Sequence, residues 1–442
     1  MNPQIEGPFI LGLDIGTSRI KAAMVDRAGS LVGEPVIRST TFDPEDLIQE
    51  VGFTIDELIG RHAEPPVAVA TSCFWHGLLF IDDDGAPLGP ITSWQDTASA
   101  DAAALLGETL DPADFHARTG CFIHPSYPMV RAAKAATSFT RHKIARMIGP
   151  AEWVMLNLFG ADATSPSMAS ATGFTELGGE SYLDEALEAA GVSVKELPAI
   201  NTEPLAGLLK DWADRWPELE TIPWLLAVGD GACAAVGSGC LDGTHAALTI
   251  GTSSAVRVIV EEKPVPPQGL FAYSMPTTRY LVGGAASNAG NVLAWARNVF
   301  KLPHDAVASA LRKAPEPGLE VSSFLAGERA PDWPLVSEGS IEGIRLTTTS
   351  TDILRGLIDS VSGSIVSLVR SIDAWVGAET VLVGSGGVVE TETEWFAHIC
   401  ELVGRQISVA PTLHTSLSGA AILAWESLGG DNDPPAVGQP DR

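Results

Sequence analysis

The chain has 442 residues, of which 45% are hydrophobic, and a formal net charge of −28 at pH 7. This length suffices for two or three domains with sizeable cores, and the acidic balance argues against nucleic acid or an anionic membrane as a partner. Five cysteines without a Cys-x-x-Cys pair favour reduced core thiols over disulfides or zinc. With no signal peptide and no membrane span visible in the sequence, we expect a soluble cytoplasmic protein.

The first predicted element is a hairpin over residues 9–26. A near-continuous apolar run and an alternating apolar run predict two strands, joined by a tight turn at Asp14-Ile-Gly-Thr-Ser18. Gly16 allows the backbone to approach a ligand closely, and the Thr17 and Ser18 hydroxyls with nearby N–H groups can hold phosphate oxygens. Asp14, at the strand end, is placed to carry a divalent cation. The same residues are also ordinary turn formers, so this hairpin alone does not decide the function.

Aromatic and histidine side chains follow the next predicted strand. Residues 67–70 and 78–81 are expected to be strands, with Phe74-Trp-His76 between them. Such side chains at a strand end are typical of a ligand face in α/β folds, although His76 alone is more typical of a core histidine. Asp96 precedes an Ala-rich helix over residues 99–106. It either caps that helix or accepts hydrogen bonds from substrate hydroxyls.

The only locally basic stretch runs from Arg131 to Arg146, where we expect a helix with most of its charges solvated. Short strands and polar turns are predicted over 163–177, and an amphipathic helix that stops at a glycine over 182–191. An apolar strand then ends at Gly229-Asp-Gly231 and continues into a helix of small residues. Asp230 therefore lies at a strand-to-helix turn, aimed into a crevice, a position that is compatible with capping the helix.

Residues 246–260 repeat the first hairpin, because Leu-x-Ile-Gly-Thr-Ser occurs again half a chain later. A repeat at this separation predicts two related domains, each contributing one glycine hairpin to a shared cleft. Thr249 stands where the first copy has Asp14. We therefore expect one half to hold a metal ion while the other only holds phosphate.

Helices are predicted over 292–300, 354–376 and 418–425, followed by a tail from 429 to 442. A buried strand runs from residue 380 into Gly386-Gly387, a turn suited to the close approach of a nucleotide. Neither Gly-x-x-x-x-Gly-Lys-Ser/Thr nor Gly-x-Gly-x-x-Gly occurs, so the P-loop and Rossmann interpretations lose their main support.

Taken together, these segments resemble the FGGY carbohydrate kinases of the actin-like ATPase fold, and within them the gluconokinase-like members. The resemblance spans nearly the whole chain. It rests on ten short motifs in the expected order: Asp14-Ile-Gly-Thr-Ser18, Phe74-Trp-His76, Trp94-x-Asp96-Thr97, Thr119-Gly-Cys-x-Ile-His-Pro-x-Tyr127, Ser165-Pro-Ser-Met-Ala-Ser170, Gly229-Asp-Gly-Ala-Cys-Ala234, Leu248-x-Ile-Gly-Thr-Ser253, Gly283-Gly-Ala-x-Ser-Asn288, Phe324-Leu-Ala-Gly-Glu-Arg329 and Gly384-Ser-Gly-Gly387.

The resemblance implies an α/β fold of two related actin-like ATPase (ribonuclease H-like) domains with a cleft between them. We expect the domains over residues 1–240 and 241–428, with a tail over 429–442. It further implies that ATP phosphorylates a hydroxyl of a sugar or sugar acid, with gluconate as the leading candidate. Xylulose or another polyol is the alternative acceptor. The oligomeric state is left open, with a homodimer as one alternative.

The resemblance also assigns roles to residues. Asp230 is similar to the family's general base, and Asp14 to its Mg²⁺ partner, acting through water. The other expected positions fall into two groups. For ATP they are Gly16, Thr17, Ser18, Gly251, Thr252, Ser253, Gly386 and Gly387. For the sugar they are Trp75, His76, Asp96, His124 and Gly229.

Three arginines common among relatives are replaced here. Ala98 follows the Trp-x-Asp-Thr motif, Glu338 precedes Gly339 in the second domain, and Ser418 precedes the final Gly-Ala-Ala. Because guanidinium is the usual partner of a carboxylate or of paired hydroxyls, the loss near the sugar pocket suggests altered specificity. Arg131 and His124 are candidates to replace it. A non-catalytic sugar-binding protein derived from a kinase is a further alternative.

Overall fold

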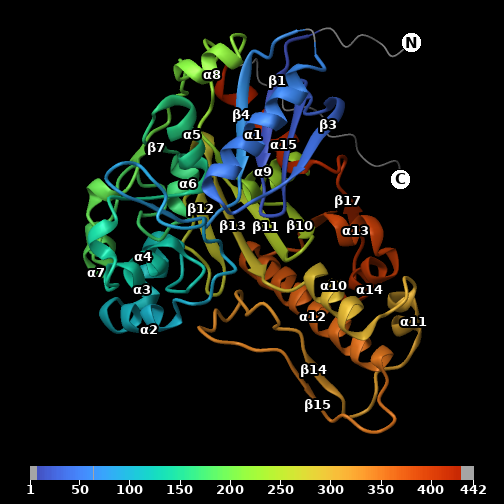
Figure 1. The fold of residues 1–442 in the computed structure, drawn as a ribbon. Coiled ribbons are helices and arrows are strands. Elements are labelled where there is room, and N and C mark those ends of the chain that lie inside the picture. Colours follow the sequence, from blue (N-terminus) through green and yellow to red (C-terminus); the bar gives the residue numbers. More distant parts are fainter. Residues whose placement is uncertain (1–6, 63, 430–442) are drawn as a thin grey trace.

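The computed structural model describes residues 7–62 and 64–429, and their backbone is organised around two β-sheets (Figure 1). The first sheet has the strand order β3-β2-β1-β4-β9, and the second has the order β12-β13-β11-β10-β16-β17. The strands of the first sheet are β1 (Ile10–Ile15), β2 (Arg19–Val25), β3 (Leu31–Ser39), β4 (Ala68–Cys73) and β9 (Val228–Gly229). Those of the second are β10 (His245–Ile250), β11 (Ser254–Val260), β12 (Phe271–Ser274), β13 (Tyr280–Ala286), β16 (Val381–Ser385) and β17 (Ile407–Val409).

The two sheets share one pattern of pairing. In each, an antiparallel hairpin (β1–β2 or β10–β11) is extended on one side by antiparallel strands, β3 in the first sheet and β13 with β12 in the second. On its other side it is extended by parallel strands. Both predicted hairpins form, with Asp14 opposite Lys21 in the first and Thr249 opposite Ala255 in the second. The predicted fold class, α/β with two related halves, is confirmed.

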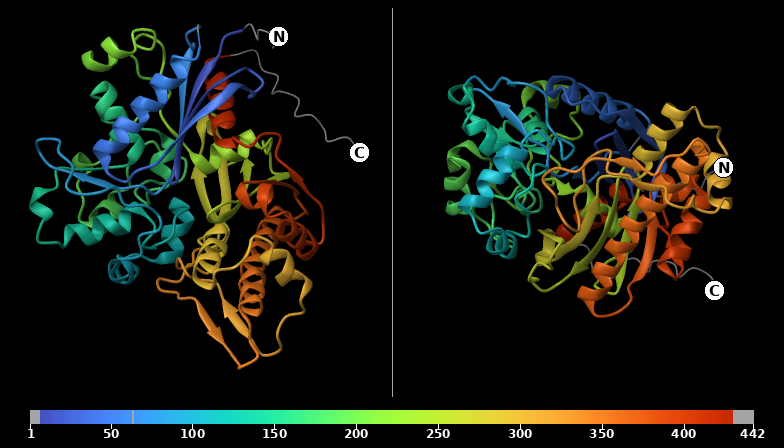
Figure 2. Two further views of the ribbon diagram at one scale, coloured as in Figure 1. Left: turned by 45° about the vertical axis from the view of Figure 1, so that its right-hand side comes forward. Right: turned by 90° about the horizontal axis from the view of Figure 1, so that it is seen from below.

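Helices and short strands surround these sheets. In the first half they are α1 (Pro44–Ile59), α2 (Ala100–Thr109), α3 (Pro112–Thr119), α4 (Pro128–Ala136), α5 (Pro150–Phe159), α6 (Pro166–Ser170), α7 (Asp184–Ala190), α8 (Lys210–Arg215) and α9 (Asp230–Gly237), with β5 (Leu79–Ile81), β6 (Arg146–Ile148), β7 (Ala163–Thr164) and β8 (Ala199–Ile200). In the second half they are α10 (Gly290–Phe300), α11 (Ala306–Arg312), α12 (Ser350–Val376), α13 (Gly387–Thr391), α14 (Thr393–Val403) and α15 (Thr415–Ser427), with β14 (Glu320–Ser322) and β15 (Ser340–Glu342). Figure 2 shows α2, α3, α4 and α7 on one side of the first sheet, and α10, α11, α12 and α14 around the far end of the second.

The long helix α12 shows why these segments end where they do. Thr349 accepts a hydrogen bond from the Asp352 backbone N–H, and the Asp352 carboxylate accepts one from the Thr349 N–H, which completes a capping box. At the other end Gly377 adopts a left-handed φ of 79° and stops the helix. Both signals are visible in the sequence, and the helix extends the predicted range of 354–376 by one turn.

Two small-residue helices, α9 and α15, cross between the halves. A Cβ at Gly237 would lie 2.0 Å from the Thr415 carbonyl oxygen, and one at Gly419 would lie 1.8 Å from the Cys233 carbonyl oxygen. The helices therefore approach so closely that only glycine fits at the crossing. Although α15 ends the described chain, it packs against β1 and β4 of the first sheet, so the last helix ties the two halves together.

Some local predictions are corrected. The prediction of a single basic helix from Arg131 to Arg146 is wrong. Helix α4 stops at Ala136, a 3₁₀ turn spans Arg141–Lys143, and β6 pairs with β5. The irregular segment predicted over 163–177 contains the short helix α6. Four of the five cysteines are buried and Cys400 is half-buried. None of the described helices is long and apolar enough to cross a membrane. Apart from Gly429, the predicted tail lies outside the described residues.

Candidate active site

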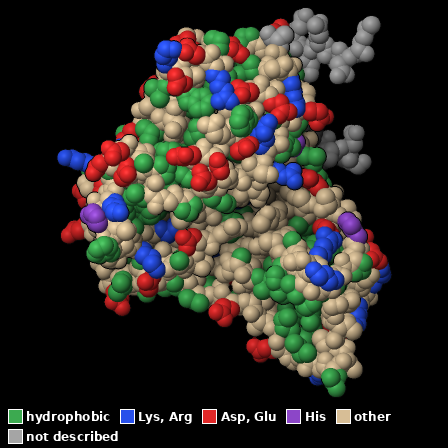
Figure 3. Space-filling model, in the orientation of Figure 1, with side chains coloured by type: hydrophobic (Ala, Val, Ile, Leu, Met, Phe, Trp, Pro, Cys, Tyr) green, Lys and Arg blue, Asp and Glu red, His purple; other side chains and the backbone are tan. Residues whose placement is uncertain are grey.

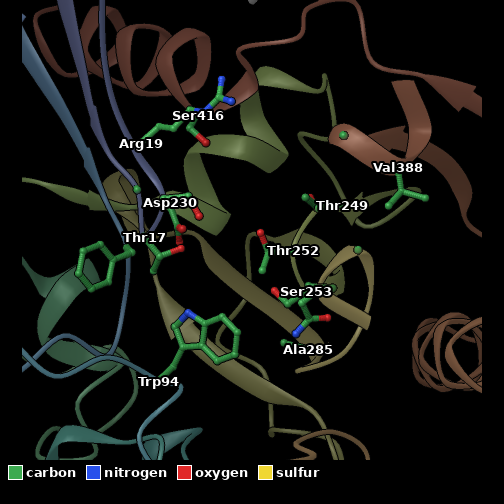
Figure 4. Close-up of a pocket in the computed structure, with 18 of the residues that line it drawn as sticks. Thr17, Arg19, Trp94, Asp230, Thr249, Thr252, Ser253, Ala285, Val388 and Ser416 are labelled. Atoms are coloured by element: carbon green, nitrogen blue, oxygen red, sulfur yellow. The ribbon is translucent and has the colours of Figure 1, made fainter. Parts of the chain in front are cut away.

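A cleft of about 1220 Å³ lies between the two halves, and both glycine hairpins reach it. In Figure 3 the surface is hollowed between the upper part of the molecule and its lower lobe. Figure 4 shows Thr17 and Asp230 on one side of the cleft and Thr252 and Ser253 on the other. Eleven of the expected site residues line it: Asp14, Gly16, Thr17, Ser18, Trp75, His76, Asp230, Gly251, Thr252, Ser253 and Gly387.

The first hairpin places Asp14 at the end of β1, where its side chain is 3% exposed. Its Oδ1 accepts a hydrogen bond of 2.9 Å from the Ser72 hydroxyl, and its Oδ2 accepts one of 3.0 Å from Lys21 Nζ. A carboxylate has about four lone-pair positions, so two remain for a hydrated cation. The Gly16 N–H closes the turn on the Arg19 carbonyl at 3.0 Å. This geometry leaves Thr17 and Ser18 at the edge of the cleft.

Asp230 is the first residue of helix α9, directly after β9. The glycines on both sides of it leave room for neighbouring side chains. A Cβ at Gly229 would lie 1.8 Å from Cε2 of Trp75, and one at Gly231 would lie 2.6 Å from Nε of Arg257. Only glycine leaves room for these two cleft side chains. Burial raises the pKa of the Asp230 carboxyl to about 6, Asp14 adds to the increase, and Arg257 opposes it. Gly229 is the N-cap of α9 and Asp230 is its first helical residue, so Asp230 does not occupy the capping position considered from the sequence.

The second hairpin is backed by the start of α10 and by α13. Gly290 donates a backbone hydrogen bond of 2.9 Å to the Gly251 carbonyl, and Asn291 donates one of 3.1 Å to that of Thr252. Gly386 has a φ of 99°, and a Cβ there would lie 2.7 Å from the Ile250 carbonyl oxygen. Gly386 thus lies behind the cleft wall. Gly387 borders the cleft, and a Cβ there would meet open space.

Trp75 and His76 form the wall opposite the second sheet. Trp75 Nε1 donates to the Ser167 carbonyl at 3.1 Å, and its ring meets that of Tyr273 edge-on at 4.9 Å. His76 has a φ of 64°, a left-handed conformation that is rare for a residue with a side chain. Burial lowers the pKa of His76 to about 3, so the ring is neutral near pH 7. Nδ1 of this ring lies 2.9 Å from the Ala171 carbonyl oxygen and Nε2 lies 3.4 Å from the Tyr273 hydroxyl, so Nε2 holds the weaker contact and is the atom that could exchange it for a ligand hydroxyl.

Four expected sugar or nucleotide residues do not line the cleft. Gly229 and Gly386 lie behind it, as described above. The Asp96 carboxylate accepts from the Ala98 N–H at 2.8 Å and borders a separate depression. His124 is 4% exposed and is held by the Ser126 hydroxyl at 2.8 Å and the Pro334 carbonyl at 3.2 Å. His124 therefore joins the first half to a loop of the second.

Neither candidate replacement for the missing arginine reaches the cleft. The Arg131 guanidinium is buried and donates to the Thr92 hydroxyl at 2.7 Å and to the carbonyls of Ser93 and His76. This corrects the idea that Arg131 belongs to a solvated face. It instead secures the turn at His76. Four other arginines line the cleft: Arg19, Arg257, Arg297 and Arg329.

Sequence reasoning missed these arginines, together with Trp94 and Tyr273, as site residues. The Arg329 guanidinium lies over the Trp94 ring at 4.2 Å, and Trp94 points into the cleft in Figure 4. Burial lowers the pKa of Arg329 to about 10, which still leaves it charged at neutral pH. Arg257 lies between Val256 and Val258 on β11. A charged residue within a mostly apolar strand was the sequence signal that could have identified it as a site residue.

The positions where family arginines are absent lie away from this cleft as well. Ala98 and Glu338 are exposed, and neither borders the cleft. Ser418 is buried on α15 and donates a hydrogen bond of 2.5 Å to the Gly29 carbonyl. Its small side chain fits the turn that follows β2.

Comparison with known proteins decides the family. Residues 9–237 match the N-terminal domain of the FGGY family of carbohydrate kinases, and residues 246–427 match the C-terminal domain of that family. The chain belongs to the FGGY family of carbohydrate kinases. As an FGGY kinase it is a phosphotransferase that acts on a carbohydrate with ATP.

Relatives of this FGGY kinase differ in their sugar. The gluconokinase of Bacillus subtilis (strain 168) is 27% identical over 454 residues, covering 95% of this chain and 88% of its own. The xylulose kinase of Streptomyces rubiginosus is 30% identical over 455 residues, covering 98% and 90%. Two solved structures from Lactobacillus acidophilus, a ligand-bound xylulose kinase and a gluconate kinase, superpose with TM-scores of 0.86 and 0.85. Each is 22% identical and covers 97% of this chain and 91% of its own, a similarity that supports the fold.

Proposed function

We propose that this FGGY kinase transfers the γ-phosphoryl group of ATP to a hydroxyl of a sugar or sugar acid, with gluconate as the leading acceptor. Asp230 is the general base that takes the proton of the attacking hydroxyl. The observation that carries the proposal is the position of Asp230, a carboxylate with a raised pKa, between two phosphate-binding hairpins in one cleft. Gluconate leads because a gluconokinase is among the relatives that match over most of the chain.

The residues at the hairpins fit MgATP. Hydroxyls of Thr17, Ser18 and Thr252 and the bare backbone at Gly251 offer donors to the β- and γ-phosphates from both sides. Among residues 7–62 and 64–429, no three His, Cys, Asp or Glu side chains gather into a metal cage. A single carboxylate suits Mg²⁺, which keeps several waters and binds substrate phosphates. Asp14 would hold that ion through water, and MgATP supplies the phosphoryl group with part of its charge neutralised.

The remaining assignments concern positioning. Gly387, with Gly386 behind it, would flank the adenosine, since a side chain at Gly387 would narrow the cleft and one at Gly386 would push against the Ile250 carbonyl behind the wall. Trp75 and neutral His76 would bind the sugar, with Gly229 supporting the Trp75 ring. Because phosphoryl transfer has a loose transition state, catalysis depends mainly on positioning and electrostatics. One base that is aligned with the attacking hydroxyl therefore suffices. Closing the cleft would exclude water as a competing acceptor.

Asp96 and His124 need separate treatment. Both were expected at the sugar, and both lie outside the cleft wall in this structure. We propose that they reach the sugar only if the loops around residues 96 and 334 rearrange on closure. Xylulose is the second candidate acceptor, since a xylulose kinase is 30% identical over 98% of the chain.

A sugar panel tests the proposal. ADP release should be measured with MgATP and gluconate, xylulose, ribulose, glycerol or erythritol. We expect gluconate to give the highest kcat/KM. Turnover with xylulose alone would replace gluconate by the second candidate. Sugar-dependent thermal stabilisation without turnover on any sugar would favour the binding-protein alternative.

A further inference from the structure

Arg257 projects from β11 into the cleft through a slot that two glycines leave open. A Cβ at Gly231 would lie 2.6 Å from its Nε, and one at Gly283 would lie 3.0 Å from its Cγ. Glycine is therefore required on both sides of the side chain if it is to stay in place. The slot comes from three separate elements, β11, β13 and the start of α9.

Most N–H donors of the Arg257 guanidinium have no hydrogen-bond partner among the described residues. Its one hydrogen bond is a long contact of 3.4 Å from Nη1 to the Thr249 hydroxyl, and its buried Nε has no partner among the described residues. No carboxylate of the described chain lies within ion-pair distance of it. Arg131, by contrast, uses its donors on four surrounding oxygen atoms. A guanidinium has five N–H donors, so Arg257 retains most of its capacity for a ligand.

Its place along the strand indicates which part of the substrate it meets. Ser253, Ala255 and Arg257 alternate along one face of the hairpin and all line the cleft. Ser253 lies at the phosphate end, Ala255 leaves space, and Arg257 lies further from the tip, near Trp75 and Tyr273. An open-chain acceptor that presents one hydroxyl to Asp230 would extend along this face.

We infer that Arg257 binds the carboxylate of the acceptor and makes the site selective for sugar acids over neutral sugars of the same length. This inference rests on the phosphotransfer function proposed above. Arginine and carboxylate form paired, charge-assisted hydrogen bonds, which are the strongest of the ordinary kinds. A neutral acceptor would leave the half-buried guanidinium without a partner, and that loss is the source of the discrimination.

Gluconate and its neutral amide, gluconamide, test the inference, because they differ only at the carboxylate. In the wild-type enzyme we expect kcat/KM to be roughly 10- to 100-fold higher for gluconate, the range for hydrogen bonds to a charged group. In Arg257→Gln this ratio should fall toward one, chiefly through the KM for gluconate. Arg257→Lys should restore part of it. Arg370→Gln, an exposed arginine on α12, is the matched control and should keep the wild-type ratio.

The ratio separates this role from two others. If Arg257 acted only by tuning Asp230, both acceptors would lose activity equally and the pH profile would shift. If it contacted the transferring phosphate beside Thr249, both would lose activity and the KM for ATP would rise. Either result would overturn the inference and leave the kinase function standing.

A wild-type enzyme that turns over no sugar acid would instead refute the proposed acceptor. Calorimetric titration with gluconate then decides the inference alone. Gluconate binding that is lost in Arg257→Gln supports it, and absence of gluconate binding to the wild-type protein overturns it.

Discussion

Replacing Gly229 by alanine would drive a methyl group into the ring of Trp75. The added Cβ would lie 1.8 Å from Cε2 and 2.2 Å from Nε1, whereas carbon atoms pack at about 3.5–4.0 Å. The ring must therefore move by roughly 2 Å and give up its hydrogen bond of 3.1 Å to the Ser167 carbonyl. Overpacking costs about 1–3 kcal/mol and the hydrogen bond about 1 kcal/mol, so we expect a total of about 2–4 kcal/mol.

This free-energy cost of Gly229→Ala should appear either as a lower stability of the folded protein or as weaker binding of the sugar. If Trp75 is displaced, the same free energy corresponds to a roughly 30- to 700-fold rise in KM for the sugar. Thermal melting and steady-state ADP release, measured on the same preparation, distinguish the two. Gly363→Ala is the control, because a Cβ at this position of α12 meets open space and should leave both unchanged or slightly stabilise the helix. If Gly229→Ala matched Gly363→Ala in melting temperature and in sugar kinetics, the proposed support of Trp75 would be refuted.

Three further predictions concern the rest of the cleft. Asp14→Asn should raise the Mg²⁺ concentration needed for half-maximal activity, and an unchanged metal titration would remove Asp14 from the metal role. Because the pKa of Asp230 is raised to about 6 and only its ionised form accepts a proton, kcat/KM should fall tenfold per pH unit below about pH 6 and stay level above it. Activity that persists to about pH 4, where an ordinary Asp titrates, would contradict this. Gly386→Ala, whose Cβ would lie 2.7 Å from the Ile250 carbonyl oxygen, should raise the KM for ATP more than that for the sugar, and the reverse order would contradict the adenosine assignment.

Local patterns carried the prediction of the two hairpins and of the strand-to-helix turn at Asp230. In each case the spacing of apolar residues changes within a few residues of a glycine that predicts a turn. The same kind of signal gave the long helix α12. Packing of α15 onto the first sheet was not predictable this way, because the contact joins segments about 400 residues apart. The prediction of one helix over the basic stretch was wrong for a related reason, because β6 forms by pairing with β5, which lies far earlier in the chain.

The residues that line the cleft were predicted better at the two hairpin turns than on the remaining walls. Each hairpin turn consists of consecutive residues, so Asp14, Thr17 and Thr252 could be recognised from their neighbours. The other walls combine side chains from distant strands, and Arg257 and Tyr273 stand among apolar residues that resemble core strand positions. Only the three-dimensional structure brings these side chains together.

The central claim is that Asp230 is the base for phosphoryl transfer to a sugar, and Asp230→Asn tests it most directly. ADP release with MgATP and the preferred sugar should be compared between this variant and the wild-type enzyme, with nucleotide binding measured by calorimetry on both. We predict a loss of about 10²–10⁴-fold in kcat, as for removal of a positioned general base, with MgATP binding retained. Sugar-dependent turnover that survives in Asp230→Asn would contradict the account.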